Sequence, residues 1–206
     1  METSSLAENV LSLRESWEES CLQKSSRRDF VQDPEAELAE DCKSGNVAAY
    51  EQLFYSHGAR MKSIALNILG NAPDAEDAVQ EAFLKIYRNV VQFKGESTFA
   101  TWIYRILINA CYDFARKRRK QEGLKSELEG NPSLSATSSS DHSLKLILER
   151  SLCNLDERMR TVFVLFEAEG FKHREIAQIL NIAEGTSKSL LFDARKELQR
   201  VLWKSY

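Results

Sequence analysis

The chain has 206 residues, of which 43% are hydrophobic and 29% are charged, and its formal net charge is -3. These values are typical of a globular protein with one or two domains and argue against a disordered chain. No signal-peptide core and no apolar run of membrane-spanning length is visible, so we expect a cytoplasmic protein without direct membrane insertion. Only three prolines and eight glycines are present, and no alternating run of β-branched residues stands out, which predicts an all-α fold.

Charge is unevenly distributed along the chain. Residues 1–40 hold ten Asp and Glu against four Lys and Arg, whereas residues 83–120 hold nine Lys and Arg against two Asp and Glu. Such asymmetry is expected when only part of a protein faces nucleic acid. The four cysteines and three histidines are scattered without metal-ligand spacing, so we expect no metal site and no cofactor. No nucleotide-binding glycine loop or nucleophile–base pairing is visible, and no catalytic residue is assigned.

Residues 1–33 form an acidic N-terminal tail with a weak apolar pattern, compatible with a short amphipathic helix or with a loosely held segment. A helix is predicted to begin at Pro34, with Asp33 as its N-cap, and to end before Gly45. Asn46 is expected to cap a longer helix that ends at Gly70.

The next predicted helix opens at Asp74 in the segment D-A-E-D-A-V-Q-E-A-F-L-K-I-Y-R. Acidic side chains suit the first turn of a helix because they complement its positive end. From the residues alone, Asp77 would serve this purpose, and Gln80 and Glu81 would be solvated. The inward face is expected to comprise Ala78, Phe83, Ile86, Tyr87 and Val90.

The most informative stretch runs from Phe93 to Lys120. It begins as a polar turn, becomes an aromatic-rich helix with Ser97 as its expected N-cap, and ends in the five consecutive cations of residues 116–120. Cationic side chains bind phosphates, aromatic rings stack on unpaired bases, and an Asn amide can hydrogen-bond to a base edge. This combination therefore favours the binding of single-stranded nucleic acid. The alternative is that the rings are core residues, as most aromatics at helical spacing are, and that the cations only complete a helix end.

The pattern F-K-G-E-S-T-F-A-T-W-I-Y-R-I-L-I-N resembles region 2 of bacterial sigma factors of the extracytoplasmic-function group, and the preceding acidic helix is a second match. The resemblance implies that this helix docks on the β′ clamp helices of RNA polymerase through Asp77, Gln80 and Glu81. It also implies that the following turn and helix capture the −10 element as the promoter melts. The residues implied in −10 binding are Phe93, Lys94, Phe99, Trp102, Arg105, Asn109 and Arg116.

Residues 121–141 contain Gly, Pro and a Ser-rich run without an apolar period, and predict a flexible linker between domains at 34–120 and 142–206. In the second domain, helices are expected over 144–153 and from Asp156, an N-cap, to Gly170. A short helix over 172–180, a turn over 181–183 and a long helix from Glu184 then form a helix-turn-helix. Helix pairs of this kind also occur in proteins that never touch DNA.

These last helices resemble region 4 of the same sigma group, which implies that they read the −35 element. The sequence departs from the family pattern at three positions. Leu190 and Asp193 stand where the family usually has arginines, and Ser187 stands where it usually has a buried valine. The loss of cations should weaken phosphate attraction, although Leu190 could contact a thymine methyl. The residues implied in −35 binding are Thr186, Lys188, Ser189, Phe192, Arg195 and Lys196.

Together the two matches imply a non-catalytic sigma factor whose partners are core RNA polymerase (β′ clamp helices and β subunit) and promoter DNA. An anti-sigma factor is a further implied partner, because the family is commonly held inactive by one. Two alternatives stay open. One is a free-standing helix-turn-helix regulator that binds duplex DNA by residues 155–203, with residues 38–118 as an effector or dimer domain. The other is a sigma-like protein that occupies polymerase yet reads promoters poorly.

Overall fold

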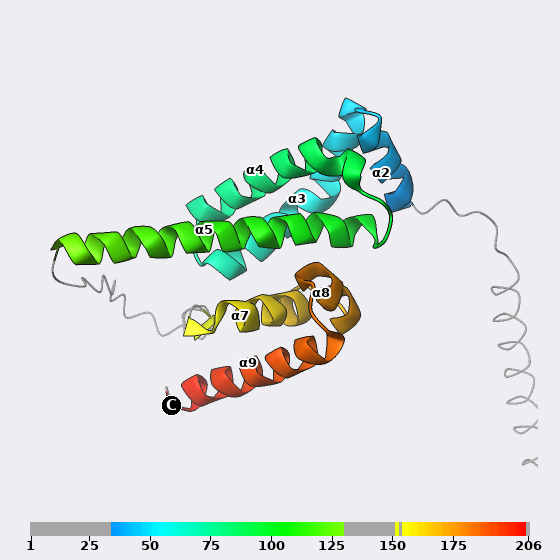
Figure 1. Ribbon diagram of the computed structural model, residues 1–206. Helices are drawn as coiled ribbons and strands as arrows, with labels where there is room; N and C mark the ends of the chain where they lie inside the picture. Colours follow the sequence, from blue (N-terminus) through cyan, green and yellow to red (C-terminus); the bar gives the residue numbers. More distant parts are fainter. Residues whose placement is uncertain (1–33, 130–150, 153, 205–206) are drawn as a thin grey trace, which may run out of the picture. The chain divides into compact units, whose positions relative to one another are not determined.

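The computed structural model describes residues 34–129, 151–152 and 154–204. Within these ranges every regular element is a helix, so the predicted all-α fold is confirmed. None of these helices is long and apolar enough to span a bilayer. The elements are α2 (Pro34–Lys43), α3 (Val47–Leu69), α4 (Ala72–Asn89), η1 (Val90–Gln92), α5 (Phe99–Glu129), α7 (Glu157–Phe163), η2 (Val164–Ala168), α8 (His173–Leu180) and α9 (Glu184–Lys204) (Figure 1).

Helix α3 begins and ends where the sequence predicts. The Asn46 side chain accepts a hydrogen bond from the Ala48 N–H at 3.0 Å, and Gly70 adopts the left-handed conformation with its N–H bonded to the Leu66 carbonyl. Helix α4 begins two residues earlier than predicted, at Ala72, because the Asn71 side chain accepts from the Asp74 N–H and caps the helix. The predicted tail and the predicted cap at Asp33 lie outside the described residues.

Helix α5 differs from the prediction at both ends. Its N-cap is Thr98 rather than Ser97, because the Thr98 hydroxyl accepts from the Thr101 N–H at 3.2 Å and the helix begins at Phe99. At the other end the helix continues to Glu129, so the prediction of an irregular linker is wrong for residues 121–129. A helix already formed can extend through a single glycine such as Gly123 at modest cost. The rest of the predicted linker lies outside the described residues.

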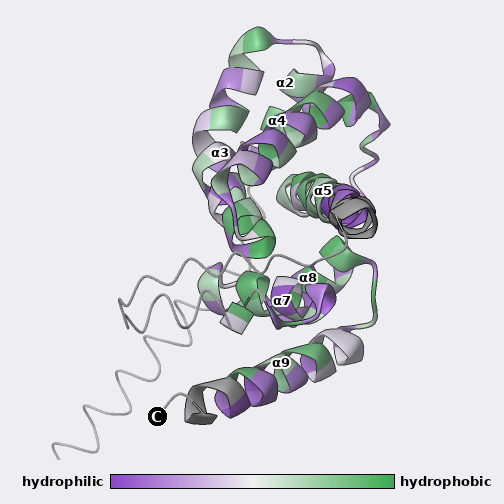
Figure 2. Cartoon of the chain, turned by 90° about the vertical axis from the view of Figure 1, so that its left-hand side faces the viewer, coloured by the Kyte–Doolittle hydropathy of each residue, from purple (hydrophilic) through white to green (hydrophobic). Residues whose placement is uncertain are grey.

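Helices α3, α4 and α5 pack their apolar faces against one another, with α2 closing one end (Figures 1 and 2). Side chains at three- and four-residue spacing from each helix are removed from water, which is the main stabilising contribution to such a bundle. Those with no exposed area are Leu53, Met61, Ile64, Ala65, Ala78, Ala82, Ile86, Ile103, Leu107, Ala110 and Cys111.

Helices α7 to α9 carry the predicted helix-turn-helix. Asp156 caps α7 as predicted, accepting from the Arg158 N–H at 2.9 Å. Helices α8 and α9 are joined through Asn181, which adopts a left-handed conformation with φ 53°. The predicted helix over 144–153 falls mostly outside the described residues.

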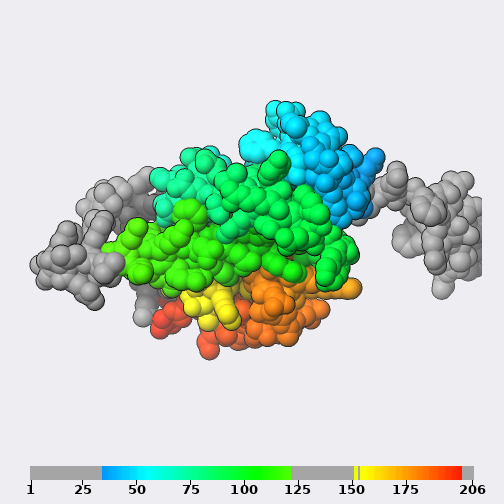
Figure 3. Space-filling view, turned by 45° about the horizontal axis from the view of Figure 1, so that its top comes forward, coloured from blue at the N-terminus to red at the C-terminus, as the bar shows by residue number. Residues whose placement is uncertain are grey.

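The two helical groups share one continuous apolar core. Val162, Leu165 and Phe171 belong to the same buried cluster as Ile103 and Leu107 of α5. Helix α8 lies directly against α5, and the space-filling view shows their surfaces in contact (Figure 3).

Candidate nucleic-acid and partner interfaces

Helix α4 presents an acidic and amide-bearing face. Asp77 and Gln80 are exposed, and Glu81 is half-buried with one carboxylate oxygen 3.7 Å from the Lys85 ammonium. Ala78 and Ala82, on the opposite side of the same turns, are buried. The three side chains predicted to contact polymerase therefore lie on the outside of the bundle and point away from its core.

An aromatic ridge adjoins this face. It consists of Tyr50, Phe54, Phe83 and Tyr87, with ring centroids 5.1 Å apart for Tyr50–Tyr87 and 5.4 Å for Phe54–Phe83. Phe54 is 56% exposed and Tyr87 64% exposed, so the assignment of Tyr87 to the inward face is wrong; Phe83 is half-buried. Large apolar groups gathered at a surface mark contacts with other macromolecules. Periodicity did not reveal the ridge because the Tyr87 ring packs at a tilted angle against Tyr50 of α3 instead of entering the core.

The three aromatic residues predicted for −10 binding form a cluster at the start of α5. Phe93, Phe99 and Trp102 lie with ring centroids 5.3–5.9 Å apart, and the Phe99 and Trp102 rings are nearly parallel. Phe93 and Phe99 are buried and Trp102 is half-buried, so Trp102 presents the most ring surface to solvent. Lys94, in the loop before the helix, is exposed.

The remaining predicted −10 residues follow along α5. Asn109 and Arg116 are exposed, and Arg116 is paired with Asp113 at 3.2 Å. Arg105 is half-buried because its Nη2 donates to the Gln178 carbonyl oxygen of α8 at 2.7 Å. The structure therefore leaves Asn109 and Arg116 accessible and engages Arg105 within the protein.

The basic stretch of α5, residues 116–120, is only partly a free cationic surface. Arg118 donates to the Leu69 carbonyl and to Asp74, each at 3.2 Å. Arg119 donates to Glu157 of α7 at 2.6 Å. Two of the five consecutive cations are thus partly neutralised by acceptors far away in the sequence, which a charge count could not reveal.

Polar contacts also tie α3 and α5 to the helix-turn-helix group. Arg60 pairs with the Glu169 carboxylate at 3.0 Å, donates to the Glu169 carbonyl, and lies 4.2 Å from the centroid of the Phe171 ring. The Tyr112 hydroxyl donates to Thr161 at 3.1 Å, and burial raises the pKa of Tyr112 to about 12. Of these polar contacts, only that of Arg105 joins α5 directly to α8; Arg60 joins α3 to the segment before α8, and Tyr112 joins α5 to α7.

Helix α9 exposes every side chain predicted for −35 binding, including Phe192, which is 67% exposed. Leu191, Ala194 and Leu198 are buried on its other side. Two of the cations are already paired within the protein, Lys188 with Glu184 at 2.7 Å and Arg195 with Glu167. The exposed set comprises Thr186, Lys188, Ser189, Phe192, Arg195 and Lys196.

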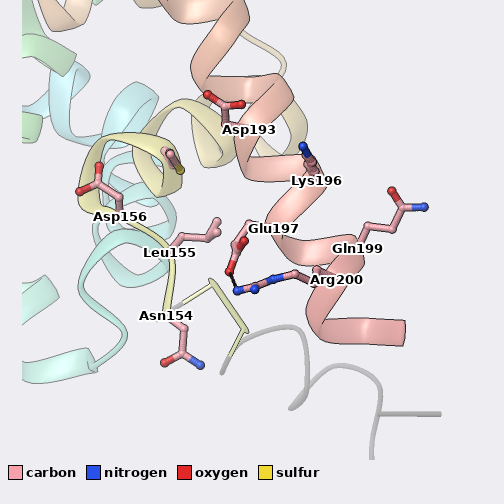
Figure 4. A pocket seen from close by; sticks show the side chains of 9 residues that line it. Asn154, Leu155, Asp156, Asp193, Lys196, Glu197, Gln199 and Arg200 are labelled. Atoms are coloured by element: carbon pink, nitrogen blue, oxygen red, sulfur yellow. Dashed lines mark hydrogen bonds and ion pairs between the residues drawn. The ribbon is translucent and has the colours of Figure 1, made fainter. Parts of the chain in front are cut away.

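Asp193 lies among these residues. Ser189, Asp193 and Lys196 follow at four- and three-residue spacing, so they share one face of α9. Asp193 and Lys196 also line an open hollow between the start of α7 and α9, together with Glu197 and Arg200, which bond to each other (Figure 4). An acid at this position offsets the positive potential that Lys196 would offer to phosphates.

Ser187 is buried and has a hydrogen-bond partner in the half-buried His173. Its side chain has no exposed area, and its hydroxyl lies 3.0 Å from His173 Nδ1, whose ring stacks on Phe166 with centroids 4.5 Å apart. A buried hydroxyl without a partner would destabilise the fold. His173 therefore explains how this chain accommodates a polar residue where the family usually has valine.

Among the residues that the structure describes, no group of three or more potential ligands is arranged to hold a metal ion. Cys42 and Cys111 are buried free thiols, and burial raises the pKa of Cys42 to about 11 and that of Cys111 to about 12. Thiols with such pKa values are protonated at neutral pH and chemically inert.

Both halves of the chain match known families. Residues 53–121 match Sigma-70 region 2, and residues 145–198 match Sigma-70, region 4. The RNA polymerase sigma-H factor of Pseudomonas aeruginosa is 29% identical in an alignment covering 84% of this chain and 96% of that protein. The ECF RNA polymerase sigma factor SigM of Mycobacterium tuberculosis is 31% identical, over 82% of this chain and 84% of that protein.

A solved structure of a sigma factor is also similar to this chain. The sigma factor RpoE in complex with the anti-sigma factor NepR from Bartonella quintana is similar with a TM-score of 0.61 and 27% identity, over 76% of this chain and 98% of that chain. Both sequence and fold thus agree with the motifs described above. The chain belongs to the extracytoplasmic-function group of RNA polymerase sigma factors.

Proposed function

We propose that this chain binds core RNA polymerase, directs it to specific promoters and assists strand opening at the −10 element. The observation that carries the proposal is the order of the two family matches along one chain, with the predicted docking residues Asp77 and Gln80 exposed on α4. A free-standing regulator would have no use for such a face, whereas a sigma factor must be held by polymerase.

Docking on polymerase would use the α4 face and the aromatic ridge together. Asp77, Gln80 and Glu81 supply acceptors and an amide for basic or polar side chains on the partner. The aromatic ridge, in which Phe54 and Tyr87 are exposed, supplies apolar area that becomes buried on binding. Interfaces of this composition, with aromatic anchors beside charged groups, are typical of specific protein association.

Strand opening would use the start of α5. Unpaired bases must be captured as they leave the duplex, or they re-anneal. Trp102 offers a half-buried ring beside those of Phe93 and Phe99, the exposed Lys94 offers a cation to DNA phosphates, and Asn109 offers an amide to a base edge. Aromatic stacking and cationic side chains are the usual means of holding single strands. Phe93 and Phe99, being buried, would act mainly by supporting Trp102.

Reading of the −35 element would fall to α9. Ser189, Phe192 and Lys196 are exposed on the second helix of a helix-turn-helix, the element that enters the major groove in such motifs. Asp193 lies on the same face and would repel phosphates. We therefore expect weaker phosphate attraction at −35 than an arginine at this position would give.

A regulator of the anti-sigma class is a further proposed partner. The structure of RpoE with NepR shows that a related sigma factor binds one. Because core polymerase and promoter DNA are cytoplasmic, this chain would act in the cytoplasm, as a transcription initiation factor rather than as a catalyst.

The test is reconstitution with purified bacterial core polymerase. We expect the chain to co-elute with core enzyme and to give run-off transcripts from promoters selected out of random DNA. The variant Gln80→Ala/Glu81→Ala should lose most of the co-elution. The variant Glu184→Ala/Gln199→Ala removes the same two residue types from exposed positions of α9 and should retain it.

The other outcomes separate the alternatives. Tight binding to duplex DNA without binding to core enzyme would contradict the proposal and favour a free-standing regulator. Co-elution without transcripts would indicate a protein that occupies polymerase but reads promoters poorly, and would implicate Asp193.

A further inference from the structure

Helix α2 precedes the part of the chain that matches Sigma-70 region 2, which begins at residue 53. Nothing in that match gives α2 a role. In the structure, however, the two ends of α2 contact residues 93–101, which comprise the loop before α5 and the first turn of that helix. This segment carries the loop proposed to hold an unpaired base.

The first end of α2 meets the start of α5. The Glu35 carboxylate accepts a hydrogen bond from the Ala100 N–H at 3.0 Å, across 65 positions of sequence. The N–H groups of a helix's first turn have no partners within the helix, and a carboxylate there also complements the positive end of the helix dipole. Thr98 accepts from Thr101, so Glu35 and Thr98 between them bond two successive N–H groups of this turn.

Glu35 is itself held in place. Its other oxygen lies 3.7 Å from His57 Nε2, and His57 Nδ1 lies 3.1 Å from the Tyr104 hydroxyl. The Glu35 side chain is 36% exposed, whereas that of His57 is 10% exposed. A chain of contacts thus runs from α2 through α3 to the second turn of α5 and fixes the carboxylate toward Ala100.

The second end of α2 meets the start of the loop. The Lys43 ammonium lies 5.4 Å from the centroid of the Phe93 ring and 2.8 Å from Glu40. Phe93 in turn contacts Phe99 and Trp102. A helix of ten residues is about 15 Å long, so α2 spans the loop from its first residue to the helix that follows it.

We propose that α2 is a brace that holds residues 93–101 in the geometry that captures the −10 strand, with Glu35 as the main positioning residue and Lys43 as a second. This inference rests on the proposed function, since it assigns α2 to the same −10 site. Neither residue contacts DNA in this scheme. Each acts through a neighbour, Glu35 through the Ala100 N–H and Lys43 through the Phe93 ring.

The brace is tested with three single variants. Glu35→Ala removes the acceptor, Glu35→Gln keeps an oxygen that can accept from Ala100, and Glu37→Ala is the matched control. Glu37 lies in the same turn of α2, is exposed, and loses the same charge when replaced. All three should fold and bind core polymerase within about twofold of the wild-type chain, because the α4 face is unchanged.

The first readout is amide hydrogen exchange in the free protein. Removal of a hydrogen bond to a charged acceptor should speed exchange at Ala100 and its neighbours about tenfold in Glu35→Ala. Glu35→Gln should restore most of the protection, and Glu37→Ala should match the wild-type chain. Unchanged exchange in Glu35→Ala would overturn the brace.

The second readout is permanganate reactivity of unpaired thymines in promoter DNA that wild-type holoenzyme has selected from a random pool. Open-complex formation should slow about tenfold in Glu35→Ala, while binding to core polymerase and to the duplex −35 element stays unchanged. A merely structural role would reduce all three together, and that result would overturn the proposal, as would unchanged opening. If the wild-type chain does not bind core polymerase at all, the proposed function is wrong. The role of α2 in promoter opening is then wrong too, whatever hydrogen-exchange rates are measured.

Discussion

The Arg105 guanidinium of α5 donates to the Gln178 carbonyl oxygen of α8 at 2.7 Å. Its Nε atom is buried and has no hydrogen-bond partner among the residues that the structure describes. Arg105 belongs to the set predicted for −10 binding, and α8 is the first helix of the helix-turn-helix. The contact holds the guanidinium half-buried against α8, so the Arg105–Gln178 contact and −10 binding compete for Arg105.

We therefore predict that promoter binding separates α5 from α8. The −10 and −35 elements lie about 25 base pairs apart, or roughly 85 Å of duplex at 3.4 Å per base pair, whereas these helices are in direct contact. Energy transfer between dyes at Arg88→Cys and Gln199→Cys should fall when core polymerase and promoter DNA are added. Cys21 and Cys153 are replaced by Ser, and Cys42 and Cys111 are buried away from the dye.

Arg60→Ala provides the comparison for that experiment. It removes the pair with Glu169 and the contact with the Phe171 ring but none of the predicted DNA contacts. Energy transfer should already be lower in the free variant. Equal transfer in the free and promoter-bound wild-type chain would contradict the prediction.

The hydrogen bond between the buried Ser187 and the half-buried His173 predicts a coupled effect on stability. Ser187→Ala and His173→Phe should each lower the free energy of unfolding by about 1 kcal/mol, because each leaves a polar atom without its partner. The double variant should lose less than the sum, because neither polar atom is then left unpaired. Urea unfolding of the four proteins measures the coupling. Strictly additive losses would show that the 3.0 Å contact contributes nothing.

Asp193 predicts a change in DNA binding. Asp193→Arg should tighten binding to a duplex carrying the −35 element, and the slope of log affinity against log salt should steepen by about 0.9 for each phosphate newly contacted. The affinity and salt slope of Asp193→Ala should lie between those of the wild-type chain and those of Asp193→Arg. Fluorescence anisotropy at several salt concentrations provides the measurement. Glu51→Arg makes the same charge change on α3 and is the control; an equal effect there would mean that net charge, not position, is responsible.

His57 predicts a dependence of stability on pH. Burial lowers the pKa of His57 below 6.5, and Arg60 lowers it further, while Glu35 of α2 opposes the shift; the Tyr104 hydroxyl faces the ring from α5. A histidine whose folded-state pKa is lowered contributes stability above about pH 6.5, and the contribution is lost as the pH falls below that value. Between pH 7.5 and 5.5, the wild-type chain should therefore lose more stability than His57→Gln. Chemical unfolding at both pH values tests this, and parallel losses would contradict it.

Helix ends and types could be predicted from the sequence because their causes are local. Asn46, Gly70 and Asp156 act on N–H or carbonyl groups within four residues, and all three are found where predicted. The shift from Ser97 to Thr98 shows the limit of this reasoning, since either of two neighbouring hydroxyl side chains can cap a helix and the higher intrinsic preference of Ser did not decide the position. Chain order and motif spacing likewise sufficed to indicate the family and the outward α4 face.

The partners of side chains distant in sequence were decided only by the tertiary structure. Periodicity says that the rings of α5 share one face but not what covers that face, so the burial of Phe99 and the partial exposure of Trp102 could not be separated in advance. The same holds for Glu35 with Ala100, Arg105 with Gln178, and Ser187 with His173. These contacts depend on how separate helices pack against one another, and that arrangement is set by the whole buried core rather than by any short stretch of sequence.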